Sequence, residues 1–334
     1  MADRRTFLKS LAGATAGLSL INVSCNNEMK SDRLGEILPT RKLGRTNEYV
    51  TMLGAGGYHI GYKTEREGQE VIEAALESGV RFFDTAESYS KGISEERYGK
   101  FLTPKYRDLV FIMTKSTGRD AKTVQEHLEG SLRRMKTEQI DLFQVHSLKT
   151  PEDADTRVKN GVLDYILKAQ KEGKIKYLGF TGHQNPFALT RMLELTKESN
   201  IFDAVQMPVN ILDQTYFSFA KNVIPKLQER NIGLLAMKSL AAGRFFAQKK
   251  KSGGTPDDPL IPNYLSIKEA MHFVWSLPVS VLISGNENTT FMREKIALAR
   301  SFTKLSETQK LELIDKVRDI ALTGKVEYFK KKSI

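Results

Sequence analysis

Short apolar runs alternate with longer amphipathic stretches from residue 51 onward. The apolar runs predict strands, and the stretches between them predict helices. In the helix predicted over 66–79, the apolar residues share one face and Gly79 is a natural stop. The strands are predicted at 51–55, 81–84, 109–114, 140–145, 176–180, 203–207, 232–237 and 279–283. Eight such units in roughly 250 residues predict an α/β fold, the parallel (β/α)8 or TIM barrel.

Two further elements are expected outside the eight units. The stretch 40–51 predicts an N-terminal hairpin that closes the barrel floor. The stretch 306–324 predicts an extra C-terminal helix, with a capping box at its start and a glycine at its end. No linker-like stretch divides residues 36–334, so this range is expected to form one domain. Residues 26–35 are polar and are expected to be a tether.

A Rossmann sheet is the competing fold, because the segment GAGGYHIG at 54–61 is close to a dinucleotide fingerprint. The third glycine of that fingerprint would fall at His59, and no helix is predicted to open there. A lone near-match of this kind is a weak signal, so the barrel is preferred.

Residues 1–25 have the features of an export signal. Arg4 and Arg5 precede an apolar stretch that is too short to span a bilayer as a helix. The sequence around the arginine pair resembles a bacterial twin-arginine signal. Cys25 resembles a lipoprotein lipidation site, although Asn22 stands where an aliphatic residue is usual, so lipidation stays open. The protein is expected to leave the cytoplasm through the twin-arginine export machinery and to be periplasmic or lipid-anchored.

The 334-residue chain has a net charge of +11, which raises the question of nucleic-acid binding. Its basic residues are scattered, and the clusters 249–251 and 330–332 are interpreted as solvated surface. No nucleic-acid-binding motif accompanies them, so nucleic acid is not an expected partner. Cys25 is the only cysteine, which excludes an internal disulfide framework and a cysteine-based metal site. No metal site is predicted.

Ionisable residues stand at the ends of three consecutive predicted strands. Asp84 ends the second strand with Tyr89 just beyond it, and Lys115 and His146 end the third and fourth. Charged groups are rarely buried at the end of an apolar strand unless they pair. Neighbouring strands lie about 5 Å apart, and barrel active sites lie at the C-terminal ends of the strands. These four residues are therefore the candidate catalytic group.

The chemistry of this group favours carbonyl reduction. A free tyrosine has a pKa near 10, and the Lys115 ammonium is expected to lower the pKa of Tyr89 while Asp84 orients the lysine. Tyr89 would protonate an oxygen to which a neutral His146 donates a hydrogen bond. The group contains no nucleophile, so the reaction needs a hydride, which a nicotinamide cofactor supplies.

Seven segments, in order and spacing, resemble the aldo-keto reductase family: RKLGRTNEYVTMLGAGG, FFDTAESY, FIMTKS, IDLFQVHS, YLGFTG, VQMPVN and LLAMKSLAAG. The resemblance covers essentially all of residues 38–302. It implies an NAD(P)(H)-dependent oxidoreductase that reduces an aldehyde, ketone or sugar to an alcohol. It also implies a catalytic tetrad of Asp84, Tyr89, Lys115 and His146, with Tyr89 as the proton donor.

The resemblance further implies a set of cofactor contacts. Thr181 and Gln206 take positions that contact the carboxamide, and Gly182 replaces the usual asparagine. Met237 stands where many members stack a tyrosine under the nicotinamide. The complete expected set is Gly57, Tyr58, Asp84, Thr181, Gly182, Gln206, Met237, Lys238, Leu240, Gly285, Asn286, Arg293 and Glu294.

Two parts of this set concern the phosphates. Lys238 and Leu240 fall on the loop expected to cross the pyrophosphate. The family's basic residues for the 2′-phosphate would lie at Gly285 and Phe291, neither of which is basic, so Arg293 is the expected substitute. NADP(H) is expected because it is the usual cofactor of the family that the sequence resembles, and NAD(H) stays open.

Two other functions stay open at this point. One is a cofactor-binding sensor or regulatory subunit, since fold does not determine function. The other is a sugar epimerase that keeps its cofactor and returns the hydride. The aromatic residues Trp275, Tyr58, Phe245 and Tyr264 are candidates to line the mouth for a small-molecule carbonyl substrate, whose identity the sequence does not give.

Overall fold

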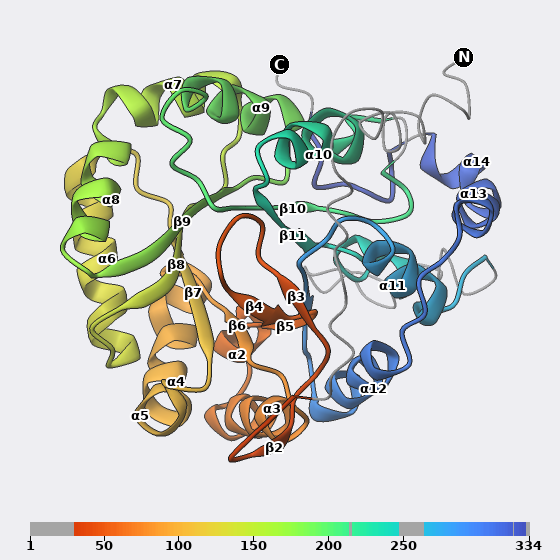
Figure 1. Ribbon diagram of the computed structural model, residues 1–334, viewed down its shortest axis with the longest axis horizontal. Coiled ribbons are helices and arrows are strands. Elements are labelled where there is room, and N and C mark those ends of the chain that lie inside the picture. The colour runs from red at the N-terminus through yellow and green to blue at the C-terminus, as the bar shows by residue number, and fades with distance from the viewer. Residues whose placement is uncertain (1–29, 214–215, 247–263, 323, 332–334) are drawn as a thin grey trace.

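The computed structural model describes residues 30–213, 216–246, 264–322 and 324–331. In this part of the chain, eight parallel strands close into a barrel in the order β10-β11-β12-β5-β6-β7-β8-β9 (Figure 1). The barrel strands are β5 (Leu53–Gly56), β6 (Phe82–Asp84), β7 (Phe111–Ser116), β8 (Ile140–Val145), β9 (Ile175–Thr181), β10 (Ala204–Pro208), β11 (Gly233–Met237) and β12 (Val281–Gly285). Each predicted strand overlaps its observed counterpart, so the predicted barrel is confirmed.

Helices surround this barrel as an outer ring (Figure 1). They are α2 (Tyr58–Tyr62), α3 (Glu65–Glu77), α4 (Ile93–Phe101), α5 (Thr103–Tyr106), α6 (Ala121–Met135), α7 (Pro151–Lys159), α8 (Val162–Lys171), α9 (Pro186–Leu195), α10 (Phe219–Glu229), α11 (Ile267–Trp275), α12 (Thr289–Arg300), α13 (Glu307–Lys316) and α14 (Arg318–Ala321). Two 3₁₀ helices, η2 (Tyr89–Gly92) and η3 (Ala241–Phe246), follow β6 and β11.

Helix α3 shows how the local sequence sets these elements. The Thr64 side chain and the Glu67 side chain exchange hydrogen bonds with each other's backbone N–H groups, which starts the helix with a capping box. Val71 and Ile72 are buried against the barrel. After the helix, Gly79 has a φ of +91°, which glycine adopts at little cost, and the chain turns into β6.

Apolar side chains fill the lower half of the barrel interior. Phe82, Met113 and Leu142 come from neighbouring strands, and the hairpin of β3 (Thr40–Lys42) and β4 (Tyr49–Thr51) adds Leu43 and Val50 to the same cluster. The predicted hairpin that closes the floor is therefore confirmed. The polar side chains of the candidate site stand above this apolar layer, at the other end of the strands.

The boundary of the predicted tether needs a correction. Part of it forms the antiparallel pair β1 (Ser31–Asp32) and β2 (Gly35–Glu36). Arg81 Nε, just before β6, donates to Asp32 Oδ2 at 2.6 Å, and this bidentate pair holds the hairpin on the barrel. The predicted signal and residues 26–29 lie outside the described residues. Among the helices that are described, none is long and apolar enough to cross a membrane.

The C-terminal region differs from its prediction in two ways. The single helix predicted over 306–324 is the pair α13 and α14, because Val317 between them departs from helical geometry; the Ser306 and Gln309 capping box is present. Lys330, predicted to be solvated, is buried with its ammonium paired to carboxylates. The other predicted lysine cluster, at 249–251, lies outside the described residues.

Candidate active site

Asp84, Lys115 and Tyr89 form one hydrogen-bonded cluster at the C-terminal end of the barrel. Asp84 is the last residue of β6, and Lys115 lies one residue before the end of β7. The Lys115 Nζ atom donates to Asp84 Oδ1 at 2.5 Å, to the Thr85 carbonyl oxygen at 2.7 Å and to Tyr89 Oη at 3.2 Å. The Lys115 side chain is 1% exposed and that of Asp84 4%. This ion pair is therefore shielded from water.

The backbone turn after β6 brings Tyr89 over Lys115. Within this turn Ser90, Lys91 and Gly92 have φ angles of 51°, 57° and 95°. A non-glycine residue in the left-handed region costs about 1–3 kcal/mol and persists only where the surrounding packing enforces it. In this arrangement Lys115 Nζ lies 4.6 Å from the centre of the Tyr89 ring.

Burial raises the pKa of Tyr89 to about 12, although Lys115 acts in the opposite direction. The expectation that Lys115 brings this pKa below its ordinary value is therefore wrong, because the loss of hydration outweighs the ammonium. Tyr89 is consequently a phenol at neutral pH, which is the form that donates a proton. Burial lowers the pKa of Lys115, but Asp84 and Tyr89 more than reverse this effect and leave it raised.

His146 follows β8 and completes the cluster. Its ring centre lies 6.0 Å from that of Tyr89, with the two rings nearly perpendicular. Burial, reinforced by the charge of Lys115, lowers the pKa of His146 well below its usual value. The imidazole is therefore neutral, as predicted. Its buried Nδ1 atom has no hydrogen-bond partner among the described residues.

Further buried polar atoms at the C-terminal ends of the next strands lack a hydrogen-bond partner in the described part of the chain. Gln206 Oε1 lies in β10, Ser239 Oγ follows β11, and Asn286 Oδ1 follows β12. An unsatisfied buried polar atom costs about 1–3 kcal/mol, so a ligand that bonds these atoms is favoured. Their spread over three neighbouring strands fits an extended ligand with several polar groups, such as the predicted nicotinamide nucleotide.

Comparison with known proteins identifies the family. Residues 52–321 match the sequence model of the Aldo/keto reductase family. The chain belongs to this family. The matched range contains Asp84, Tyr89, Lys115 and His146, and the family resemblance read from the sequence motifs is confirmed.

Relatives of this aldo-keto reductase family member include named oxidoreductases. The Uncharacterized oxidoreductase YrpG of Bacillus subtilis is 30% identical over 203 residues, which cover 49% of this chain and 61% of that protein. The L-glyceraldehyde 3-phosphate reductase of Escherichia coli K12 is 26% identical over 245 residues, 68% of each chain. The matches span less than two thirds of the first two relatives, 61% of YrpG and 65% of YqkF, also from Bacillus subtilis.

Solved structures share the fold. The aldo-keto reductase AKR11C1 from Bacillus halodurans, in its holo form, superposes with a TM-score of 0.69 at 22% identity, covering 84% of this chain and 96% of that chain. The glycerol dehydrogenase AKR11B4 from Gluconobacter oxydans has a TM-score of 0.64 at 21% identity, covering 84% of this chain and 95% of that chain. At these identities the likeness shows the barrel fold.

In this aldo-keto reductase, Gly57 and Tyr58 lie beside the tetrad. The Gly57 N–H donates to the Asp84 carbonyl oxygen at 2.7 Å, and a Cβ on Gly57 would lie 2.4 Å from that oxygen. Only glycine permits this close approach of β5 to β6. The Tyr58 ring meets the Tyr89 ring edge-on, with their centres 5.4 Å apart. Gly57 therefore lies against Asp84, and Tyr58 lies against Tyr89.

Thr181 is the last residue of β9, and Gly182 follows it. Thr181 is 1% exposed, and the Gly182 N–H donates to the Gln206 carbonyl oxygen at 3.3 Å. A Cβ on Gly182 would lie 2.8 Å from the Leu148 carbonyl oxygen, closer than real contacts allow. The asparagine that is usual at this position would therefore require the backbone to shift.

The loop predicted to cross the pyrophosphate begins at the end of β11. Met237 is the last residue of β11, and Lys238 follows in a left-handed conformation with a φ of 53°. The Lys238 Nζ atom lies 5.2 Å from the centre of the Phe329 ring, and Leu240 is partly buried. The C-terminal segment thus reaches this loop, which the sequence did not indicate.

The region after β12 contains a basic residue that sequence reasoning missed. Arg293 and Glu294 are exposed on α12, whereas Lys295 Nζ donates to the Gly285 carbonyl oxygen at 2.5 Å. Burial lowers the pKa of Lys295 to about 8. A Cβ on Gly285 would lie 2.7 Å from the His59 ring. Helical periodicity is the signal that would have favoured Lys295 over Arg293 as the inward residue of α12.

Other side chains depart from the sequence-based expectation. Trp275 lies in the core, and its Nε1 atom donates to the Met52 carbonyl oxygen at the floor end of β5, away from the tetrad. Phe245 is also fully buried. Neither Trp275 nor Phe245 therefore presents an exposed face to the entrance of the site. Gln144 in β8 was missed: it is fully buried, and its two amide atoms have no hydrogen-bond partner among the described residues.

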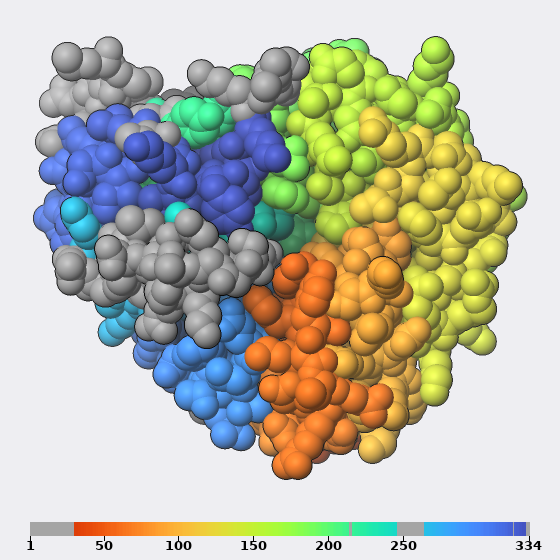
Figure 2. Space-filling model, turned by 180° about the vertical axis from the view of Figure 1, so that it is seen from behind, coloured from red at the N-terminus to blue at the C-terminus, as the bar shows by residue number. Residues whose placement is uncertain are grey.

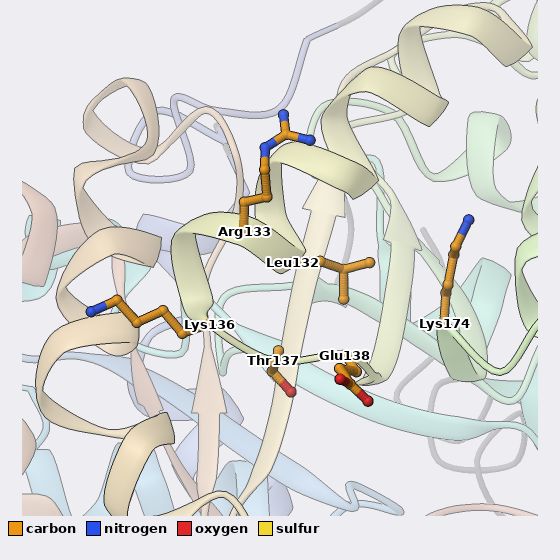
Figure 3. Close-up of a pocket in the computed structure, with 6 residues that line it drawn as sticks. All are labelled: Leu132, Arg133, Lys136, Thr137, Glu138 and Lys174. Atoms are coloured by element: carbon orange, nitrogen blue, oxygen red, sulfur yellow. The ribbon is translucent and has the colours of Figure 1, made fainter.

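A surface hollow lies elsewhere on the molecule (Figure 3). It is lined by Leu132, Arg133, Lys136, Thr137, Glu138 and Lys174. These residues come from the C-terminal end of α6 and from the segments that lead into β8 and β9, so the hollow lies at the opposite end of the barrel from the tetrad. The long side chains in Figure 3 point apart, and the hollow contains no tetrad residue.

Proposed function

We propose that this protein is an NAD(P)(H)-dependent oxidoreductase that reduces the carbonyl of an aldehyde, ketone or sugar to an alcohol. The observation that carries the proposal is the Lys115 ammonium, which joins buried Asp84 to the Tyr89 phenol beside a neutral His146. A bound nicotinamide would supply the hydride. Gln206, Ser239 and Asn286 carry the polar atoms that would hold the nucleotide.

The proton chemistry follows from the residues of the chain. Tyr89 Oη donates its proton to the carbonyl oxygen as negative charge develops there. The resulting phenolate is stabilised by Lys115 Nζ at 3.2 Å, and Asp84 holds that ammonium in place. Neutral His146 donates a hydrogen bond to the same substrate oxygen and orients the carbonyl. Because burial raises the pKa of Tyr89 to about 12, the protonated phenol that carbonyl reduction requires is the prevailing form at neutral pH.

The class of substrate is supported by the relatives. One is named an L-glyceraldehyde 3-phosphate reductase and a structural neighbour is named a glycerol dehydrogenase, so a small polyhydroxylated carbonyl compound is a suitable first candidate. NADP(H) is the proposed cofactor and NAD(H) the alternative. Lys238 after β11 and Lys295 on α12 are the basic residues proposed to contact phosphate oxygens.

Purified full-length protein is expected to consume NADPH in the presence of glyceraldehyde or other small aldehydes, with a lower rate for NADH. The decrease in absorbance at 340 nm would measure the rate of oxidation of each nucleotide. Binding of a nucleotide without turnover across an aldehyde, ketone and sugar panel would contradict a reductase and favour a sensor or regulatory subunit. Conversion of one sugar into its epimer without added nucleotide would favour the epimerase.

We propose that the protein is exported through the twin-arginine machinery and binds its cofactor before it crosses the membrane. The support is Arg4 and Arg5 in the first 25 residues, together with the low level of nicotinamide nucleotide outside the cytoplasm. The Arg4→Lys/Arg5→Lys variant is expected to remain in the cytoplasm. Cell fractionation and acid or base extraction of the exported protein would measure location and bound nucleotide. Export of that variant, or exported wild-type protein without nucleotide, would contradict the proposal.

Lipidation of Cys25 is the second part of the location proposal. If Cys25 carries a lipid, the wild-type protein is recovered with membranes and the Cys25→Ser variant is released in soluble form. Recovery of both proteins in the soluble periplasmic fraction would instead show a protein without a lipid anchor.

A further inference from the structure

Three ionisable side chains are buried together where the C-terminal segment meets the loop after β10. The side chains of Asp213 and Glu327 are each 1% exposed, and that of Lys330 is 0% exposed. Lys330 Nζ pairs with Asp213 Oδ1, donates to Glu327 Oε2 at 2.6 Å and donates to the Tyr216 carbonyl oxygen at 3.0 Å. All three N–H donors of the ammonium are therefore used.

The carboxylates of this cluster are fixed by the loop after β10 and by α10. Asp213 accepts hydrogen bonds from the backbone N–H groups of Phe219 at 3.0 Å and Ala220 at 2.7 Å, at the start of α10. The Asn210 Nδ2 atom donates to Glu327 Oε1 at 2.8 Å. The cluster thus ties the C-terminal segment to a loop at the catalytic end of the barrel.

The same segment reaches two neighbouring loops. The Lys331 N–H donates to the Gln184 carbonyl oxygen, after β9, at 2.9 Å. Phe329 lies 5.2 Å from Lys238 Nζ, after β11. Residues 326–331 therefore cross the loops that follow three consecutive strands. Figure 2, seen from the side opposite the β3–β4 hairpin, shows the dark-blue C-terminal part of the chain beside a hollow in the middle of this face.

We propose that residues 326–331 form a strap that the cluster of Asp213, Glu327 and Lys330 holds across the catalytic face. In this position Phe329 fixes the direction of the Lys238 side chain, which stands on the loop expected to meet the pyrophosphate. The strap must move before that loop opens, so it slows the release of a bound nucleotide. The nucleotide part rests on the proposed function, whereas the existence of the strap and its dependence on the cluster do not.

The charges of the cluster make the strap sensitive to pH. Burial raises the pKa of Glu327 to about 7, Asp213 adds to this rise, and Lys330 opposes it. The groups that face Glu327 are Asp213, Lys330 and the neutral amide of Asn210. Because the pKa in the folded state is above the ordinary value, this contribution to stability is present at acid pH and is lost as the pH rises toward about 7. The strap is therefore held less firmly at mildly alkaline pH.

Hydrogen exchange without nucleotide tests the strap directly. The amide protection factors of residues 326–331, corrected for intrinsic exchange, are expected to fall by about tenfold or more between about pH 5.5 and about pH 8, since one pKa unit corresponds to a factor of ten. Glu327→Gln removes the titrating group and is expected to give the same protection at both pH values. Equal pH dependence in wild type and Glu327→Gln, or no pH dependence in wild type, would overturn the role of the cluster.

Nucleotide release tests the retention role. Lys330→Met is expected to release NADPH faster than wild type by stopped-flow fluorescence, because Asp213 and Glu327 lose the ammonium that joins them. Lys331→Met is the matched control, since its exposed side chain lies next in the chain and outside the cluster, and it is expected to keep the wild-type rate. If Lys330→Met lost the amide protection of residues 326–331 but released NADPH at the wild-type rate, the strap would not retain the nucleotide.

Two outcomes separate this inference from the proposed function. If wild type binds neither NADPH nor NADH, the proposed function fails while hydrogen exchange still decides whether the strap exists. If Lys330→Met does not fold, Glu327→Gln replaces it, because the amide keeps the shape of the side chain. That variant is expected to release NADPH at a rate independent of pH, and a rate that follows the wild-type pH profile would overturn the proposal.

Discussion

Phenylalanine in place of Tyr89 is expected to lower kcat for carbonyl reduction by about 10²–10⁴-fold, the usual loss when a general acid is removed. The affinity for nucleotide is expected to stay near the wild-type value. The physical reason is that Tyr89 Oη is the phenol beside Lys115 Nζ, whereas the ring contacts with Tyr58 and His146 survive in phenylalanine. Single-turnover reduction with NADPH and fluorescence titration of nucleotide binding would measure the two quantities.

A second tyrosine provides the matched control. Tyr106→Phe makes the same chemical change in α5, outside the tetrad, and is expected to keep the wild-type kcat. If Tyr89→Phe also kept a near-normal kcat, another group would have to deliver the proton and the tetrad assignment would be wrong. Loss of both kcat and nucleotide affinity would instead indicate that the hydroxyl also supports the nucleotide site.

The barrel could be predicted from the sequence because its signals are local. The barrel strands are short apolar runs, and several of the helices between them begin with their own capping residues, as Thr64 and Glu67 show for α3. The clustering of the candidate site residues could be predicted for a related reason. Parallel strands end at one face, so Asp84, Lys115 and His146 at the ends of adjacent strands had to lie near one another.

The features that were missed depend on contacts between distant parts of the chain. Lys330 is 117 residues from Asp213, and a lysine beside other lysines gives no local sign that it will be buried. The pKa of Tyr89 was predicted in the wrong direction because neighbouring charges can be read from motifs, whereas the loss of hydration depends on packing around the finished site. The position of Trp275 was also missed, because its hydrogen bond to Met52 at the floor of the barrel joins distant parts of the chain.

Replacement of Lys115 by methionine is expected to remove carbonyl reduction and to destabilise the barrel. The phenolate of Tyr89 would lose the ammonium that stabilises it, so the catalytic loss should be comparable to that of Tyr89→Phe. Asp84 would remain buried without its partner, and breaking a buried pair in this way typically costs about 3–5 kcal/mol. Thermal unfolding and single-turnover kinetics would measure the two effects separately.

The pH dependence of stability and a double variant identify the cause. Burial raises the pKa of Asp84 and Lys115 opposes this rise, so the pKa rises further when the lysine is removed. A folded-state pKa above the unfolded value gives stability that is present at acid pH and lost as the pH rises through the raised pKa. Lys115→Met should therefore melt at progressively lower temperature above the ordinary carboxyl range.

Asp84→Asn/Lys115→Met removes the buried charge as well as its partner. This double variant is expected to recover most of the lost stability and to lose the pH dependence, while carbonyl reduction stays absent. Recovery of stability without recovery of activity would separate the structural role of the ion pair from its role in holding the Tyr89 phenolate. If the double variant remained as unstable as Lys115→Met at every pH, the loss would come from side-chain packing, and Asp84 would not be the group that makes Lys115 necessary for folding.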